Sequence, residues 1–156
     1  MDLRTKLEYF RKEHDDIQRF LDEWEGALRL AAREDDEERS KGLARLREAE
    51  NDLLSIQEHC HAEERTVESP FRIYLDDASL ARLVQEHGLL RQLTNDYIRE
   101  LTFATLLRTG DLVGVGTKLL EQLRRHITYE TALLKQIEDG RAAEEKVLLQ
   151  YTHPGE

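Results

Sequence analysis

One run of apolar residues near the start of the sequence constrains the fold more than any other feature. Between residues 3 and 28, apolar side chains recur in alternating steps of four and three, and one histidine takes a place in the series. This spacing puts the side chains on one face of an α-helix, whereas a β-strand alternates with a period of two. The sequence therefore predicts a helix over 3–32 with one buried face. Its inward residues are Leu3, Leu7, Phe10, His14, Ile17, Leu21, Trp24 and Leu28.

Three further helices with the same spacing are predicted along the chain. The second spans 42–67, the third runs from an N-cap at Ser79 to Gly110, and the fourth runs from an N-cap at Asp111 to Gly140. Their inward residues are Leu43, Leu46, Ala49, Leu53, Ile56, Cys60 and Glu63, with His59 beside them; Leu80, Leu83, His87, Leu90, Thr94, Tyr97, Leu101 and Ala104; and Leu112, Val115, Leu119, Leu123, His126, Glu130, Leu133 and Ile137.

The connections between these helices are short, which favours antiparallel neighbours. The acidic stretch 33–41 predicts a solvated turn, with a solvated helix end as the alternative. Pro70 is expected to break the helical pattern, because proline disfavours helix at the residue before it. The sequence thus predicts an all-α, up-down-up-down four-helix bundle over residues 1–140. Residues 141–156 are expected to form a frayed or loosely docked C-terminal tail in which His153 is solvated.

Composition and charge narrow the range of functions. The chain has 156 residues, of which 39% are hydrophobic and 36% charged, and its formal net charge is -10. A single domain with charged outer faces fits these values, and nucleic acid or an anionic membrane is disfavoured as a partner. No apolar run approaches ~20 residues and the start "MDLRTKLEYF" lacks a signal-peptide core, so we expect a cytoplasmic protein. The single cysteine, Cys60, excludes an internal disulfide, and the oligomeric state stays open.

Each predicted helix carries one inward histidine, and two of these histidines are followed four residues later by a glutamate. His59 precedes Glu63 and His126 precedes Glu130, so the members of each pair share a helix face. At ~1.5 Å per residue, the distances of these residues from the connecting turns agree closely for the first three helices and roughly for the fourth. We therefore expect one polar layer in the core, nearer the 68–78 connection. Its members are His14, His59, Glu63, His87, His126 and Glu130.

The chemistry of such a layer favours metal ions. A purely structural hydrogen-bond network would have to satisfy four imidazoles and two carboxylates in a dry core, where partly satisfied networks are costly. Six ligands are too many for one tetrahedral zinc ion. They suit two divalent or trivalent ions that are bridged by the glutamates, each ion taking two histidines and keeping an open position.

The motifs at these positions carry a family resemblance. "KEHDDI", "HCHAE", "QEHGLL" and "HITYE" match, in order, the pattern H, HxxxE, H, HxxxE, and the sequence resembles the hemerythrin family in its HHE cation-binding form over residues 1 to about 138. The resemblance implies a non-heme centre of two iron ions with an oxo or hydroxo bridge, which handles O2, NO or peroxide. The implied ligands are His14, His59, His87 and His126 as terminal ligands and Glu63 and Glu130 as bridges.

The sequence departs from the oxygen-carrying members of that family. Their further histidine on the third helix corresponds to Leu83 or Arg91 here, and their aspartate after the last histidine corresponds to Thr131. The chain is thus more similar to iron-centre repair proteins and to the iron-sensing domain of a ubiquitin-ligase subunit. The leading hypothesis is a di-iron protein that binds or reacts with O2, NO or peroxide, in sensing or in a stress response. Iron donation, a redox enzyme that reduces NO or decomposes peroxide, and a metal-free helical interaction module are the alternatives, and enzymatic activity stays open.

Some residues near the layer have competing interpretations. Glu58 and His61 have the spacing of a ferritin-like di-iron motif, but the pair occurs once and lies on the outer face, so we expect both to be solvated. Cys60 is expected to be a buried inert thiol, with metal ligation or redox sensing as the alternative. The aromatic residues expected to pack nearby, or to shape access to the ions, are Phe71, Tyr74, Tyr97 and Tyr129.

Overall fold

The computed structural model describes residues 2–65 and 69–152, with side chains described as far as residue 140. The described part is helical and contains no strand beyond one isolated β-bridge between Thr105 and Arg108. Its helices are α1 (Leu3–Ala31), α2 (Asp36–Glu48), α3 (Glu50–Arg65), α4 (Pro70–Tyr74), α5 (Asp77–Phe103) and α6 (Gly110–Thr152). The predicted all-α class is therefore confirmed.

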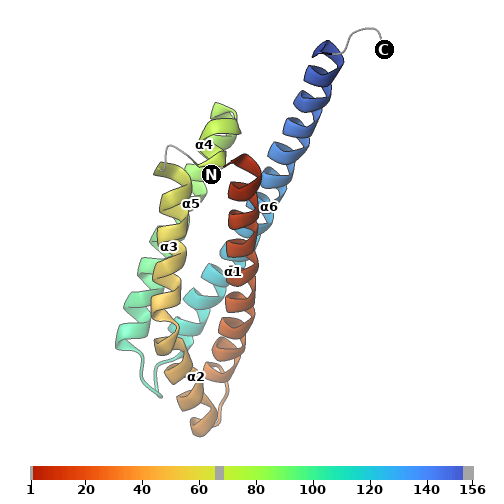
Figure 1. Ribbon diagram of the computed structural model, residues 1–156. Coiled ribbons are helices and arrows are strands. Elements are labelled where there is room, and N and C mark those ends of the chain that lie inside the picture. Colours follow the sequence, from red (N-terminus) through yellow and green to blue (C-terminus); the bar gives the residue numbers. More distant parts are fainter. Residues whose placement is uncertain (1, 66–68, 153–156) are drawn as a thin grey trace.

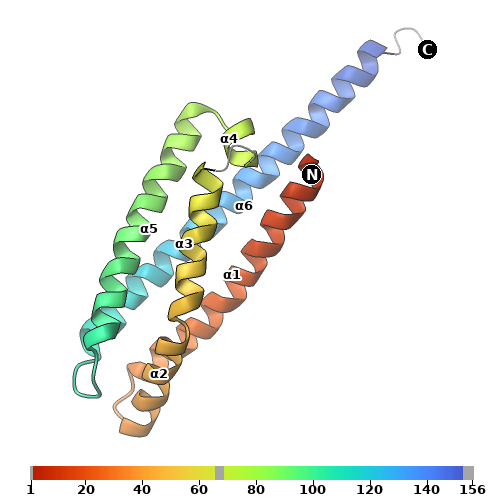
Figure 2. The ribbon, with the colours of Figure 1, turned by 60° about the vertical axis from the view of Figure 1, so that its left-hand side comes forward.

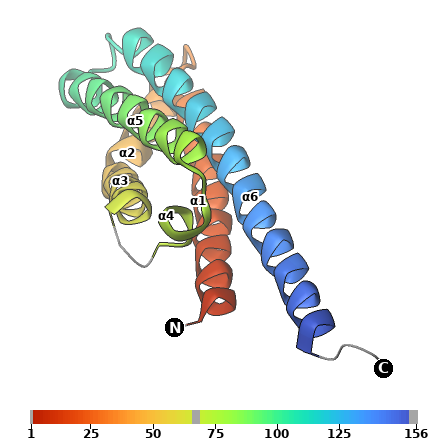
Figure 3. The ribbon, with the colours of Figure 1, turned by 90° about the horizontal axis from the view of Figure 1, so that it is seen from above.

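The long helices form an up-down-up-down four-helix bundle (Figure 1), as predicted. The four rods are α1, the consecutive helices α2 and α3, α5, and α6, and Figure 2 shows α2 and α3 following one another along the second rod. The short helix α4 contacts α1, α3 and α6 at the end where α3 stops and α5 begins (Figure 3). Across the described residues, no helix combines the length and apolar character needed to cross a bilayer.

The second rod differs from its predicted form at both ends of α2. Asp35 caps α2 by accepting a hydrogen bond from the backbone N–H of Glu38 (2.9 Å), so the acidic stretch 33–41 contains a solvated helix start rather than only a turn. The predicted single helix is also interrupted at Ala49, where no glycine or proline marks the break. Its predicted end at Val67 lies outside the described residues.

The predicted boundaries of the third helix were wrong at both ends. The N-cap is Asp76, whose carboxylate accepts a hydrogen bond from the backbone N–H of Ser79 (2.7 Å), so α5 begins before the predicted cap. The helix ends at Phe103, and Gly110 begins α6 rather than ending α5. Pro70 stands at the first position of α4, where its fixed φ angle suits a helix and its missing N–H costs nothing.

Helix α6 is longer than predicted. Asp111 lies in its first turn instead of capping it, and Gly140 does not end it, because α6 continues to Thr152. One glycine in a helix interior costs only about 1 kcal/mol relative to alanine, and the residues that follow Gly140 are mostly strong helix formers. Figures 1 and 2 show α6 projecting past the other helices. His153 lies outside the described residues, and the division into a bundle domain and a C-terminal tail stays a prediction.

Two apolar clusters fill the core and are separated by a polar layer. The larger apolar cluster draws on α1, α2, α3, α5 and α6, and the smaller apolar cluster lies at the α4 end. The larger cluster includes Ile17, Leu21, Trp24, Leu53, Tyr97, Leu119 and Ile127. The smaller cluster consists of Leu7, Phe10, Phe71, Leu83, Leu133, Leu134 and Ile137. On α1, for example, His14 lies between Phe10 of one cluster and Ile17 of the other. The buried apolar residues on each helix therefore fix the depth of the polar residues between them.

Candidate metal centre

The structure brings together all six side chains that the sequence predicts in one layer. None of them is more than 9% exposed, and the two glutamates are fully buried. Each of the four rods contributes an imidazole, and α3 and α6 add the glutamates one turn further along the same face. The polar layer consists of His14, His59, Glu63, His87, His126 and Glu130.

The four imidazoles form two pairs across the bundle. The ring centroids of His14 and His59 are 5.3 Å apart, and those of His87 and His126 are 4.6 Å apart, each pair meeting edge to face. The first pair joins α1 to α3, and the second joins α5 to α6. The layer is thus divided into two halves that each offer two ring nitrogens.

Glu63 reaches both imidazole pairs. Its Oε1 contacts His59 Nε2 and lies 3.9 Å from His14 Nε2. Its Oε2 lies 3.9 Å from His87 Nε2, in the other half of the layer. The carboxylate therefore spans the gap between the two halves.

Glu130 spans the same gap from the opposite helix. Its Oε2 lies 2.9 Å from His14 Nε2. Its Oε1 lies 2.9 Å from His87 Nε2 and also contacts His126 Nε2. Each glutamate thus presents one oxygen to each imidazole pair, which is the arrangement that two bridging carboxylates require.

Unsatisfied polar atoms concentrate in this layer. Among the described residues, most buried side-chain nitrogen and oxygen atoms without a hydrogen-bond partner belong to it. These atoms are both ring nitrogens of His14, Nε2 of His59 and of His126, both oxygens of Glu63, and Oε2 of Glu130. Such atoms cost about 1–3 kcal/mol each when nothing binds them, so their convergence fits a site for cations.

A second set of carboxylates holds three of the imidazoles from outside. Glu13 accepts a hydrogen bond from His59 Nδ1–H, Glu64 accepts one from His87 Nδ1–H (2.6 Å), and Glu86 accepts one from His126 Nδ1–H (2.8 Å). In each case the carboxylate comes from the preceding rod of the bundle. The described residues provide no such partner for Nδ1 of His14.

These outer carboxylates determine which ring nitrogen of His59, His87 and His126 directs its lone pair into the layer. A neutral imidazole carries one N–H. A carboxylate that accepts a hydrogen bond from Nδ1–H keeps the proton on Nδ1 and leaves Nε2 as an acceptor. Nε2 then faces the carboxylate oxygens of the layer. Two hydrogen-bond acceptors would therefore face each other unless a proton or a cation lies between them. The donor set of four imidazoles and two carboxylates suits Fe, Mn or Zn ions, and the ligand atoms of His14, His59, Glu63 and Glu130 all lie within 4.8 Å of one another.

The electrostatics of the two glutamates conflict in the absence of a cation. Burial, together with the charge of Glu130, raises the pKa of Glu63 well above its usual range. Burial opposes ionisation of Glu130 as well, but the imidazoles of His126, His14 and His87 outweigh it and hold the pKa of Glu130 well below its usual range. One carboxylate is therefore ionised at the cost of the other, and positive charge between them removes the conflict.

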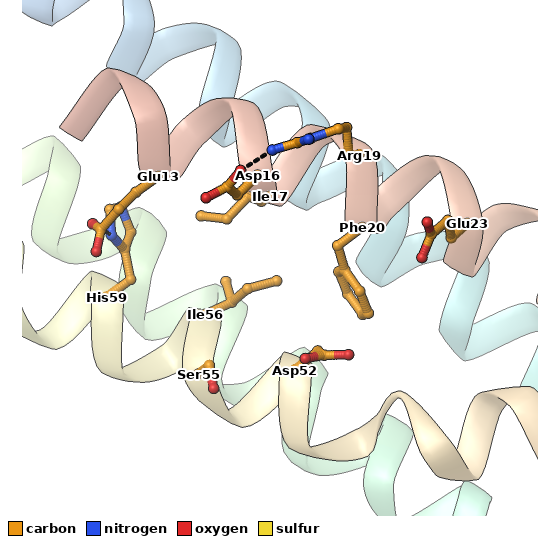
Figure 4. Close-up of a pocket in the computed structure, with 10 residues that line it drawn as sticks. All are labelled: Glu13, Asp16, Ile17, Arg19, Phe20, Glu23, Asp52, Ser55, Ile56 and His59. Carbon is orange, nitrogen blue, oxygen red and sulfur yellow. Dashed lines mark hydrogen bonds and ion pairs between the residues drawn. The ribbon is translucent and has the colours of Figure 1, made fainter. Parts of the chain in front are cut away.

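The outer carboxylates were not predicted from the sequence, although a signal for them exists. Glu13 and Glu86 each precede a layer histidine, and Glu64 follows a layer glutamate, so all three stand beside an inward position. In Figure 4, Glu13 reaches from α1 over the ring of His59 on α3, at one end of a groove of about 460 Å³ between these helices. The side chain of Glu13 is 31% exposed, so this hydrogen bond connects the layer to the surface.

The remaining candidate residues lie where packing dominates. Glu58 and His61 are exposed, which confirms that they are solvated. Tyr97 is fully buried and accepts a hydrogen bond from Trp24 Nε1–H (3.1 Å) in the larger apolar cluster. Phe71 packs in the smaller cluster, whereas Tyr74 is largely exposed and Tyr129 lies under the guanidinium of Arg82.

The positions at which the sequence departs from oxygen-carrying hemerythrins contribute no ligand. Leu83 packs in the smaller apolar cluster and Arg91 is exposed. The Thr131 hydroxyl donates a hydrogen bond to the carbonyl oxygen of Ile127 (2.8 Å). The described part of the layer therefore keeps four histidines.

Comparison with known proteins agrees with this geometry. The family model for the hemerythrin HHE cation binding domain matches residues 5–137, a span that contains the whole polar layer. No curated protein and no solved structure matches the chain significantly. The match covers most of the sequence, and the buried histidines and glutamates form a group able to hold metal. The chain belongs to the hemerythrin HHE cation-binding family.

Proposed function

We propose that this chain is a non-heme di-iron protein that binds or reacts with O2, NO or peroxide, in sensing or in a stress response. Two iron ions would be held by His14 and His59 on one side and by His87 and His126 on the other. Glu63 and Glu130 would bridge them. The observation that carries the proposal is that each glutamate directs one oxygen toward each imidazole pair.

The residues of the chain prepare this site in three ways. Both glutamates supply the negative charge that offsets two cations in a buried layer. Glu13, Glu64 and Glu86 fix the orientation of three imidazoles, as outer carboxylates commonly do at metal centres. The apolar clusters cover the layer on either side along the bundle. When bound, an iron pair supplies Lewis acidity and electrons for chemistry with small oxidants.

A route for small ligands supports reactivity over a purely structural role for metal. A groove of about 370 Å³ between α3 and α5, here called the α3–α5 groove, has the exposed residues His61 and Arg91 at its rim. The buried residues Cys60, His87 and Thr94 form its floor. A diatomic molecule or peroxide entering this groove would arrive at His87, one member of the imidazole pair of α5 and α6.

Spectroscopy of the iron-loaded protein tests the proposal. The absorption spectrum of the ferrous protein should change on addition of O2, NO or peroxide, and the change should be lost in Glu63→Ala and His126→Ala. Glu58→Ala, at an exposed position on the same helix as Glu63, is the matched control and should keep it. An iron-loaded wild-type protein whose absorption spectrum does not change on addition of any of the three molecules would contradict the proposal.

The same preparation separates the possible roles. A sensor binds its ligand in a fixed ratio to iron, whereas an NO reductase or a peroxidase turns over when an electron donor is supplied. An iron donor instead loses its iron to an apo-acceptor protein. A melting temperature that chelators leave unchanged would favour the metal-free interaction module, because a ligand bound only by the native state must stabilise that state.

A further inference from the structure

The floor of the α3–α5 groove contains a soft ligand that the six-residue site does not use. Cys60 follows His59 directly on α3, is 8% exposed, and is the only cysteine of the chain. Its sulfur and one ring nitrogen of each of His87 and His126 all lie within 4.8 Å of one another. The thiol therefore lies beside one imidazole pair, whereas His59 belongs to the other.

The spacing of these atoms is close to that of ligands on a single ion. A sulfur at about 2.3 Å and a nitrogen at about 2.1 Å from one ion are at most about 4.4 Å apart. Nε2 of His126 is buried and has no hydrogen-bond partner, although it contacts Glu130 Oε1. The histidine grouped with the sulfur therefore has a ring nitrogen that can bind a metal. The packed position of Cys60 in the larger apolar cluster therefore also places its sulfur near a nitrogen that has no hydrogen-bond partner.

We propose that Cys60 is a third protein ligand, through its sulfur, to the cation held by His87 and His126. This inference rests on the proposed metal centre and makes it asymmetric. The ion at His14 and His59 would have nitrogen and oxygen ligands only, whereas its neighbour would have two nitrogens, one sulfur and the bridging oxygens. Coordination takes the thiolate form, and the thiol proton passes to solvent when the metal binds.

The asymmetry has a chemical consequence for the groove. A thiolate donates more electron density than water does, and it occupies one of the positions that the α3–α5 groove reaches. Small ligands would then meet an ion with a soft ligand beside the remaining open position. Soft sulfur ligands also favour Fe, Co, Zn and Cu over Mg, Ca and Mn. The metal position at His87 and His126 would therefore be the more selective of the two.

Cobalt titration of the chelator-treated full chain tests this ligand directly. Co²⁺ bound by a thiolate gives a sulfur-to-metal charge-transfer band in the near ultraviolet, and any such band must come from Cys60 because the chain has no other cysteine. The band should appear in the wild type as cobalt fills the position at His87 and His126. It should vanish in Cys60→Ala and Cys60→Ser, with binding of one of the two ions weakened at least about tenfold.

Thr94→Val is the matched control. Thr94 lies on the same groove floor, but its hydroxyl donates to the carbonyl oxygen of Leu90 (2.7 Å) and the substitution keeps the side-chain shape. This variant should keep the band. Cobalt should also slow the reaction of Cys60 with a small methanethiosulfonate by about tenfold or more, because the bound thiolate is no longer a free nucleophile.

The outcomes distinguish this inference from the metal centre itself. Two bound cobalt ions without a thiolate band, or with unchanged thiol reactivity, would overturn the role of Cys60 and leave the six-residue site intact. A wild-type chain that binds no cobalt and no iron would overturn both. A band that survives in Cys60→Ala would also refute the assignment, since no other sulfur of a thiol is present.

Discussion

The larger apolar cluster and the polar layer lie next to each other on the same helices, but they differ in whether their buried polar atoms have hydrogen-bond partners. In the larger cluster, Trp24 Nε1–H donates to the hydroxyl of Tyr97, so both polar groups are satisfied. In the layer, both oxygens of Glu63 and both ring nitrogens of His14 have no hydrogen-bond partner, although His14 Nε2 lies 2.9 Å from Glu130 Oε2. One region is built for stability by itself, whereas the other is complete only with something bound.

The largest effect on stability is expected in the larger cluster. Trp24 is 1% exposed, and its ring packs edge to face on Tyr97 with centroids 5.1 Å apart. Trp24→Ala should lower the free energy of unfolding by about 3–5 kcal/mol, measured by urea denaturation, because it leaves a cavity and an unpaired phenol. Metal affinity of the folded variant should stay near that of the wild type. A loss of metal binding as large as the loss of stability would show that the two regions are not separable.

The contact between α1 and α2 gives a second test of the apolar region. A Cβ at Gly42 would lie 2.4 Å from the backbone nitrogen of Ala31, which cannot move aside as a flexible side chain could. Gly42→Ala should therefore reduce the free energy of unfolding by about 1–3 kcal/mol through overpacking. Gly114→Ala is the control, since nothing lies within 4 Å of its Cβ, and should add about 0.5–1 kcal/mol. Effects of the same sign in thermal denaturation would contradict this account.

A substitution in the polar layer should change the free energy of unfolding in the opposite direction. Glu63 is fully buried and neither of its oxygens has a hydrogen-bond partner, so its contact with His59 Nε2 offsets only part of its desolvation in the metal-free protein. Glu63→Leu should raise the stability of the chelator-treated chain by about 1–2 kcal/mol while abolishing metal binding. Glu58→Leu, at an exposed position, should change stability by less than about 0.5 kcal/mol. A destabilised metal-free Glu63→Leu variant would mean that the layer is a self-sufficient network.

The smallest effect near neutral pH is expected at Tyr97. Tyr97→Phe removes one hydrogen bond from Trp24 and should cost about 1 kcal/mol. Burial raises the pKa of Tyr97 to about 12 from its ordinary value of 10.0. The unfolded chain then releases the phenol proton first, so wild-type stability should fall from pH 10 towards 12, and the Phe variant should lack this part of the decline. Parallel pH profiles of the two proteins would show that the phenol is not buried as described.

The burial of the inward-facing residues could be predicted from the sequence, because the residues that share one face of a helix are determined by their spacing alone. His14, His87 and Glu130 occupy heptad positions whose neighbours are apolar, and burial of those neighbours places the polar residues at one depth. The helix ends were harder. The carboxylate of Asp76 competes with Ser79 as a cap, and nothing in the sequence near Ala49 marks the interruption of the second rod.

The contacts of the outer carboxylates could not be predicted from the spacing of the inward-facing residues. Whether Glu86 contacts His126, or Glu64 contacts His87, follows from how neighbouring helices rotate about their axes. A residue beside a seam can turn toward the next helix or toward water, and its spacing is the same in both cases. The position of Cys60 beside one imidazole pair rather than the other has the same origin.

The stoichiometry of bound iron tests the central claim most directly. Chelator-treated protein would be loaded with Fe²⁺ without oxygen, desalted, and analysed for metal per chain, alongside Glu130→Ala. The wild type should retain two ions per chain, and the variant should retain one or none, because Glu130 directs an oxygen toward both imidazole pairs. A wild type that retains no iron, or a variant that retains as much as the wild type, would contradict the claim that these six side chains share a pair of cations.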